Sequence, residues 1–139
     1  MGRINWGRVL LGGIVAGIII NACEYVVNGV LLARDWAAAM QALGHPIPTN
    51  ATGGFIFWGF MVGITSVASY AVARPRFGPG PKTAIVSAMG YWVIGYLLPN
   101  VSLALMAIFP VRLLNIGVLV GFVEIIVGTL AGAWLYKES

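Results

Sequence analysis

Long apolar segments alternate with short polar connections along this chain. Four apolar segments cover residues 9–33, 53–73, 83–109 and 112–136. Each is about 20 residues or longer, enough for a helix to cross roughly 30 Å of hydrocarbon. Because lipid offers no partner for backbone N–H and C=O groups, such segments must be helical. The pattern predicts an all-α membrane protein in which residues 1–139 form one domain of four transmembrane helices in an antiparallel bundle.

The first connection is long enough for a helix of its own. Asp35 can cap the start of this helix, and Gly44 can end it. Trp36, Met40 and Leu43 would share one face, with the tryptophan at the level of the lipid headgroups. We therefore expect a short interfacial helix between the first and second transmembrane helices.

The other two connections are shorter. Residues 74–82 read R-P-R-F-G-P-G-P-K, and their three prolines and two glycines predict a stiff basic turn without helix. The connection around Pro110 is so short that the third and fourth helices must be antiparallel neighbours.

Composition supports this assignment to the membrane. Of 139 residues, 60% are hydrophobic and only 9% are charged, whereas a soluble domain carries roughly 25% charged residues. The net charge of +4 does not indicate binding to nucleic acid. The basic residues lie near the predicted helix ends, where they act as topology signals.

The positions of these basic residues predict the orientation of the chain. Of the eight Lys and Arg residues, Arg34 and Arg112 fall on one side of the membrane. The other six fall on the opposite side: Arg3, Arg8, Arg74, Arg76, Lys82 and Lys137. The positive-inside rule therefore places both termini in the cytoplasm. Arg74, Arg76 and Lys82 would form a cytoplasmic basic turn, with fewer charges than the roughly four to eight of a lipid-binding cluster.

Glycines spaced four residues apart predict close contacts between helices. This spacing lets two helix backbones approach each other, which supplies packing where lipid gives no hydrophobic drive. The pairs are Gly13 and Gly17, Gly59 and Gly63, Gly117 and Gly121, and Gly128 and Gly132. They serve packing within one bundle or a specific dimer interface, and the sequence leaves both open.

Two glutamates inside the apolar segments are the strongest candidates for chemistry. A carboxylate at the centre of a membrane helix costs about 2.5–3.5 kcal/mol on insertion scales, so it is rare without a role. Glu24 shares a stripe of the first helix with Asn21 and Asn28. Because the first and fourth helices run in opposite directions, Glu124 is expected at a similar depth.

A proline inside the third helix adds another polar position. Pro99 lacks a backbone N–H, so we expect it to kink the helix and to free a carbonyl group near residue 95. Asn100 follows it directly. We expect Asn100 to face the same intramembrane polar site as the glutamates and asparagines of the other helices.

Three interpretations of the glutamates remain open. In the first, each is protonated or hydrogen-bonded and locks the bundle, with Asn21, Asn28 or Asn100 as partner. In the second, Glu24 and Glu124 form a site for a proton or a cation, because two carboxylates at short range disfavour each other's ionisation. In the third, one or both face a protein partner.

Enzymatic and metal-binding motifs are absent from the sequence. There is no nucleophile elbow, P-loop or dinucleotide fingerprint, so no catalytic residue is predicted and the protein is not expected to be an enzyme. A single cysteine, Cys23, and a single histidine, His45, exclude a Cys–His metal site. No cofactor is identified.

Several longer stretches resemble a known group of proteins. They read I-N-W-G-R at the start, N-x-x-E-Y-V-V-N-G-V-L-L in the first helix, and R-P-R-F-G-P-G-P-K-T in the second connection. With these stretches the chain resembles a group of small, uncharacterised bacterial four-helix inner-membrane proteins. The resemblance implies a bacterial source, a multi-pass location in the inner membrane and a four-helix fold, and it carries no activity.

The leading functional hypothesis is a small non-enzymatic transport or channel module with buried carboxylates. The alternative is an accessory or structural subunit of a larger membrane complex. Four short helices enclose little interior, so besides the lipid bilayer we expect a homo-oligomer or a larger complex as partner. Transport predicts that Glu24→Gln and Glu124→Gln abolish flux and spare folding, whereas a structural role predicts altered stability or assembly.

Overall fold

A computed structural model describes residues 3–137 as a set of helices. In chain order these are α1 (Trp6–Glu24), η1 (Tyr25–Leu31), α2 (Ala33–Ala42), α3 (Ala51–Phe77), α4 (Pro81–Trp92), η2 (Val93–Leu97), α5 (Leu98–Leu105) and α6 (Val111–Leu135). Four helical stretches are long and apolar enough to cross a membrane: Trp6–Leu31, Ala51–Phe77, Pro81–Leu105 and Val111–Leu135. The predicted all-α fold with four spans and a short helix after the first is confirmed.

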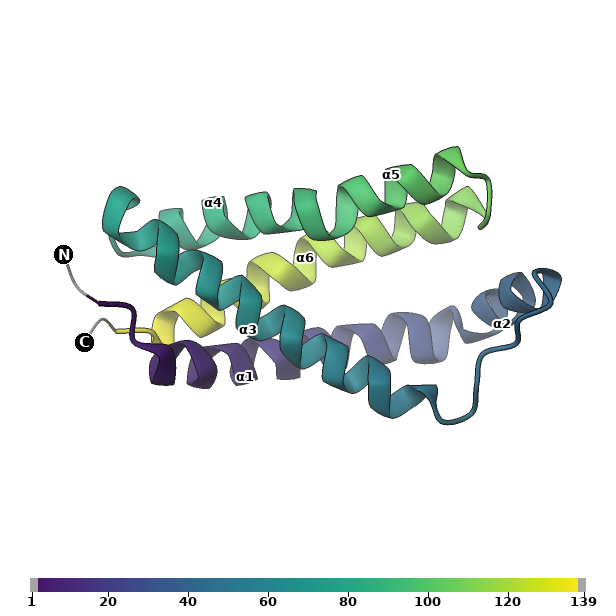
Figure 1. Ribbon diagram of the computed structural model, residues 1–139, viewed down its shortest axis with the longest axis horizontal. Helices are drawn as coiled ribbons and strands as arrows, with labels where there is room; N and C mark the ends of the chain where they lie inside the picture. Colours follow the sequence, from purple (N-terminus) through teal and green to yellow (C-terminus); the bar gives the residue numbers. More distant parts are fainter. Residues whose placement is uncertain (1–2, 138–139) are drawn as a thin grey trace.

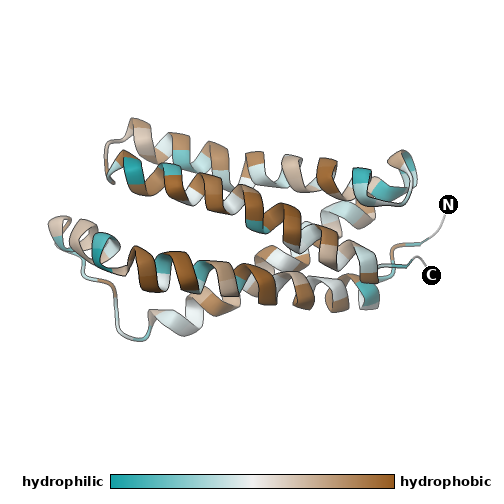
Figure 2. Cartoon of the chain, turned by 180° about the vertical axis from the view of Figure 1, so that it is seen from behind, coloured by the Kyte–Doolittle hydropathy of each residue, from teal (hydrophilic) through white to brown (hydrophobic). Residues whose placement is uncertain are grey.

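The spans form an antiparallel bundle with two distinct ends (Figure 1). Both ends of the described chain and the α3–α4 connection lie together at one end, which we call the terminal end. Helix α2 and the α5–α6 connection lie at the other, the loop end. Hydrophobic residues dominate the middle of the helices, and hydrophilic residues gather towards the two ends (Figure 2). This distribution is that of a protein whose middle lies in hydrocarbon.

Helix α1 packs closely against α3 through glycine. A Cβ atom added to Gly63 of α3 would lie 2.6 Å from the carbonyl oxygen of Gly13 and 2.7 Å from the Cα atom of Gly17. A Cβ on Gly13 would in turn meet Ile64, and one on Gly17 would meet Phe60. The backbones of α1 and α3 are therefore in direct contact, as the small-residue spacing predicts.

A second small face of α1 receives α6. A Cβ on Gly12 would meet the backbone of Gly132, with its carbonyl carbon at 3.1 Å, and Gly128 lies against Ala16 at ordinary contact distance. One turn further towards the loop end, Ile20 of α1 is fully buried. Helix α1 is thus held between α3 and α6, and the glycine contacts lie in the half of the bundle nearer the terminal end.

The third span packs along α6. The indole N–H of Trp92 donates to the carbonyl oxygen of Val118 at 2.9 Å, and its ring meets Phe122 edge-on at 5.1 Å between centroids. These contacts confirm that the third and fourth spans are antiparallel neighbours. The short α5–α6 connection imposes this arrangement.

The α3–α4 connection is more helical than the sequence predicts. Helix α3 continues through Pro75 to Phe77 and does not stop before the proline. Pro75 lies in the last turn, where Arg74 and Arg76 complement the negative end of the helix dipole. The turn itself is confined to residues 78–80, where Gly78 and Gly80 have φ values of 83° and 126° that favour glycine.

The interfacial helix α2 begins two residues before the predicted cap. It starts at Ala33, so Asp35 lies in its first turn, where its charge still complements the helix dipole. Gly44 has a φ of 72° and directly follows the residue that caps the helix, as predicted.

Two spans contain wide π-helical turns. In η1 the backbone N–H of Leu32 donates to the carbonyl oxygen of Val27 at 2.8 Å, and in η2 the N–H of Leu98 donates to Val93. Both bonds reach back five residues instead of four. The second wide turn ends just before Pro99, which cannot donate a backbone hydrogen bond itself. Single π turns of this kind are frequent at functional sites.

Candidate functional site

Glu124 on α6 is the most deeply buried charged residue of the described chain, with 1% of its surface exposed. The hydroxyl group of Tyr96, from η2, donates to its Oε1 at 2.8 Å. Gly121, one turn before Glu124 on α6, makes room for this tyrosine, because a Cβ there would overlap the ring of Tyr96. Trp58 of α3 flanks the same ring edge-on at 6.4 Å.

Glu24, the last residue of α1, lies about one turn nearer the loop end than Glu124, close enough for the two carboxyl groups to influence each other electrostatically. Side chains on a helix lean towards its N-terminus. The N-terminus of α1 is at the terminal end and that of α6 is at the loop end, so the two glutamates lean towards each other. We call Glu24 and Glu124 the carboxyl pair.

The carboxyl pair needs one proton to be satisfied. The Oε2 atom of Glu124 is buried and receives no hydrogen bond from a donor group within residues 3–137. An ionised carboxylate can only accept hydrogen bonds, whereas a protonated carboxyl group can donate one. A hydrogen bond between the two groups therefore requires that one of them carries a proton, and an unpaired charge at this depth would be costly.

A series of hydrogen bonds connects the carboxyl pair to the loop end. The side-chain amide of Asn28 donates to Oε2 of Glu24 at 2.6 Å. The indole N–H of Trp36, from α2, donates to the Oδ1 atom of Asn28 at 2.8 Å. Together with the Tyr96 hydroxyl, these residues form a polar chain that runs from α2 to the buried middle of α6.

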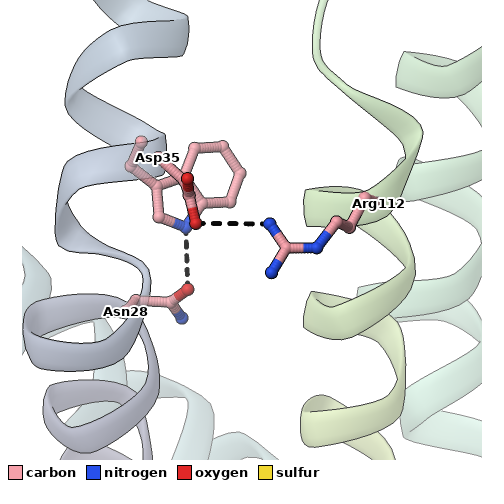
Figure 3. Close-up of polar contacts among 4 residues, drawn as sticks. Asn28, Asp35 and Arg112 are labelled. Atoms are coloured by element: carbon pink, nitrogen blue, oxygen red, sulfur yellow. Dashed lines mark hydrogen bonds and ion pairs between the residues drawn. The ribbon is translucent and has the colours of Figure 1, made fainter.

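The loop end of the polar chain is held by contacts between α2 and the start of α6. Asp35 pairs with Arg112 at 3.3 Å, beside the bond between the tryptophan and Asn28 (Figure 3). The ring of Trp36 also meets Phe109 edge-on at 5.7 Å. The contact with Phe109 places the indole donor beside the residues that lead into the fourth span.

The two wide turns adjoin the carboxyl pair. Glu24 immediately precedes η1, and Tyr96 is part of η2. Asn28 lies inside η1, so the wider turn carries the side chain that donates to Glu24. The positions of the polar chain are therefore set by local departures from the regular α-helix.

The side of the carboxyl pair towards the terminal end is closed by backbone packing. One turn beyond the level of Ile20 and Glu124, Ala16 meets Gly128, and one turn further Gly12 meets Gly132. Only the methyl group of Ala16 lies between α1 and α6 at these glycines. The structure thus places the carboxyl pair between a polar chain on one side and an apolar seal on the other.

Two of the five residues predicted for the polar site bond elsewhere. Asn21 donates to the carbonyl oxygens of Gly17 and Ile56 at 2.9 and 3.2 Å, which joins α1 to α3. Asn100 donates to the carbonyl oxygen of Tyr96 at 2.8 Å, within its own span. Asn100 therefore satisfies a backbone carbonyl group three residues before Pro99.

The predicted glycines divide in a similar way. A Cβ on Gly59 would meet the side chain of Asn21, and one on Gly132 would meet Val67 and the backbone of Gly12. Gly117 differs, because nothing lies within 4 Å of the position of its Cβ. Of the eight glycines in these pairs, every one except Gly117 thus contributes to packing within the bundle.

Two residues of the polar chain are not among the residues predicted from the sequence. The sequence predicts Trp36 at the headgroup level. The only sign of its hydrogen bond to Asn28 is the spacing of eight residues between the two. Tyr96 lies in an apolar run of the third helix. The only sequence signal that it belongs to a polar site is a hydroxyl group beside the small residue Gly95.

The remaining candidates lie apart from the polar chain or show no ligand set. Cys23 is half-buried next to Glu24, and His45 is exposed in the loop after α2. Within residues 3–137, no three side chains of His, Cys, Asp or Glu come together in a group that could hold a metal ion. Of the basic turn, Arg74 lies over the ring of Tyr136 at 5.4 Å.

The fold and the hydropathy of its helices define a multi-pass integral membrane protein with four spans. Comparison with protein-family models found no match. Comparisons with curated proteins and with solved structures found no match either. The functional argument therefore rests on the carboxyl pair and the polar chain.

Proposed function

We propose that this protein is a small proton-coupled transport module in which Glu24 and Glu124 hold and release one proton. The observation that carries this proposal is a hydrogen-bonded chain that runs from Trp36 through Asn28 to Glu24, next to the almost fully buried Glu124, which accepts from Tyr96. A proton needs no cavity, so the close packing around Glu124 is compatible with this cargo, and Glu24 is half-buried.

The chemistry of the pair supports exchange of a proton for a cation. With one proton shared, the site carries a single negative charge, which the hydroxyl of Tyr96 and the amide of Asn28 stabilise through hydrogen bonds. Loss of that proton would leave two carboxylates side by side in a medium of low dielectric constant. A cation that enters as the proton leaves would remove this penalty.

The polar chain gives the pair a route to one side. Bonds from Trp36 to Asn28 and from Asn28 to Glu24 reach towards the loop end, whereas glycine contacts close the opposite side. Transport requires access from both sides in turn, so this arrangement corresponds to a state open to protons from the loop end.

The test is a pH jump applied to proteoliposomes on a solid-supported membrane, with charge movement as the readout. The wild-type protein is expected to give a transient current, and Glu24→Gln and Glu124→Gln are expected to abolish it. Glutamine keeps the size and the hydrogen bonds of the side chain but cannot release a proton. Asp35→Asn is the matched control, because it is the same acid-to-amide change at an exposed carboxylate outside the polar chain.

A current of wild-type size in the Glu24→Gln/Glu124→Gln double variant would rule out proton release from the pair. The melting temperatures of all variants are measured in parallel, so that loss of current is separated from loss of fold.

The second candidate function is an accessory or structural subunit of a larger membrane complex. It is favoured by the fact that the polar chain connects the first, third and fourth spans and α2. A structural role predicts that the glutamine variants, which retain hydrogen bonding, change charge movement and assembly little. Substitution of Glu24 or Glu124 by leucine would instead lower stability or release the partner subunits.

The orientation in a bacterial inner membrane is also a proposal, supported by the six basic residues at the terminal end. In a Cys23→Ser background, Lys82→Cys at the terminal end and His45→Cys at the loop end place one thiol on each side. A thiol reagent that does not cross membranes should label only the His45→Cys variant in intact cells. Labelling of Lys82→Cys before lysis would reverse the orientation.

A further inference from the structure

An open groove runs along the outside of the bundle between α3 and α4. Its volume is about 470 Å³, and its lining comprises Ser69, Ala73, Phe77, Val86, Tyr91 and Ile94 together with neighbouring small residues. Gly90 is one of the lining residues, and nothing lies within 4 Å of the position that its Cβ atom would take. Phe77, Val86 and Ile94 are exposed, so the groove faces the hydrocarbon of the bilayer.

The length of the groove fits one leaflet of a membrane. Its lining extends from Ser69 to Phe77 of α3 and from Val86 of α4 to Gly95 of η2, which is eight or nine residue steps along each wall. At 1.5 Å per residue this is about 12 Å, most of the roughly 15 Å that half of a hydrocarbon core measures. The groove begins at the terminal end and stops near the middle of the bundle.

Two exposed basic residues, which are not part of the lining, lie near the terminal end of the groove in the helical pattern of its walls. Lys82 is one turn before Val86, so it continues the stripe of α4 residues that line the groove. Arg76 is three residues after Ala73 and occupies the same side of α3. A positive charge thus lies on each wall where the apolar lining meets the membrane surface.

The turn between these two residues is held in place by side-chain hydrogen bonds. The backbone N–H of Gly80 donates to the hydroxyl oxygen of Tyr70 at 3.3 Å. The hydroxyl group of Thr83 donates to the carbonyl oxygen of Gly78 at 2.7 Å. A fixed turn reduces the entropy that Arg76 and Lys82 would lose on binding a ligand.

We propose that this groove binds an anionic phospholipid, with the phosphate group between Arg76 and Lys82 and an acyl chain along α3 and α4. The charge near the terminal end of the groove, the apolar lining and the length of one leaflet all match this ligand. Basic pockets between transmembrane helices are a known setting for anionic headgroups. This site is separate from the carboxyl pair, and it does not depend on the proposed transport.

The test is native mass spectrometry of the detergent-solubilised protein titrated with phosphatidylglycerol or with phosphatidylcholine of the same acyl chains. Phosphatidylglycerol is expected to form a one-to-one adduct at lower concentration than phosphatidylcholine. The Arg76→Gln/Lys82→Gln double variant should weaken this binding about 30-fold, because each basic residue near an anionic surface contributes roughly a fivefold factor. Arg34→Gln at the loop end is the charge control.

The groove itself is tested by filling it. Gly90→Leu places a side chain in the open space on α4, and Ala73→Leu narrows the groove from α3. Either variant should reduce adduct formation with both lipids at least tenfold, while Gly117→Leu, at an equally open glycine of α6, should not. Equal binding of the two lipids by the wild-type protein, or unchanged phosphatidylglycerol binding in both groove variants, would overturn the proposal. A lipid-free dimer that Gly90→Leu abolishes would show that a second copy of the chain occupies the groove instead.

Discussion

Substitution of Gly63 by alanine tests the backbone contact between α1 and α3. The added methyl group would lie 2.6 Å from the carbonyl oxygen of Gly13 and 2.7 Å from the Cα atom of Gly17. Ordinary contacts of a Cβ atom begin at about 3.4 Å, so the two helices must separate by several tenths of an ångström. Both neighbours are backbone atoms, and they cannot move aside by a change of rotamer.

Gly128 provides the matched control for this substitution. A Cβ there would lie 3.4 to 3.6 Å from atoms of Ala16, which is ordinary contact. Both positions are inside helices, so the gain in helix propensity of up to about 1 kcal/mol on replacing glycine by alanine is common to the two variants. The difference between them isolates the cost of overpacking, which is about 1–3 kcal/mol.

The assay is unfolding of the purified protein in mixtures of a mild and a denaturing detergent, followed by tryptophan fluorescence and circular dichroism. The Gly63→Ala variant should unfold at lower denaturing detergent than the wild type, and Gly128→Ala at the same or a higher fraction. If both variants unfold together, α1 and α3 do not meet at backbone distance beside Gly63.

Three further predictions concern the polar chain and its surroundings. Tyr96→Phe should cost about 1–3 kcal/mol in the same unfolding assay, because it leaves the buried Oε1 atom of Glu124 without its donor; wild-type stability would mean that this bond is not formed. Gly121→Ala would overlap the ring of Tyr96, so its cost should be much smaller in a Tyr96→Ala background, which removes the ring; an equal cost in both backgrounds would show that the two sites are independent. Asp35→Asn should cost below about 1 kcal/mol, because its pair with Arg112 is solvent-exposed; a larger loss would show that this pair does more than hold a surface loop.

The four spans could be predicted from the sequence because a single physical constraint dominates them. Hydrocarbon must be crossed by helices with satisfied backbones, so length and hydropathy are sufficient to locate each span. The sequence predicts the end of α3 too early, because a proline inside a helix usually ends it. In the structure Pro75 occupies the last turn, which basic neighbours stabilise.

The candidate site was only partly predictable. The similar depths of Glu24 and Glu124 follow from their positions along antiparallel helices, and in the structure the two residues lie about one turn apart along the bundle. Asn21 and Asn100 bond to backbone carbonyl groups instead, because each has a carbonyl four residues earlier within reach. Tyr96 could not be placed from its spacing, because the wide turn of η2 changes which face it presents.

Under the proposed function, the same helix carries both the proton site and the seal. Glu24 ends α1, and the small residues that touch α6 begin two turns earlier on that helix, at Ala16. A proton shared between the carboxyl groups holds α1 against α6 at the edge of this seal, whereas two ionised groups would repel each other there. Contacts between glycine backbones contain no interlocking side chains, so a small separation removes them. Proton release would therefore favour opening on the side that is closed when the pair is protonated, which is the coupling that alternating access requires.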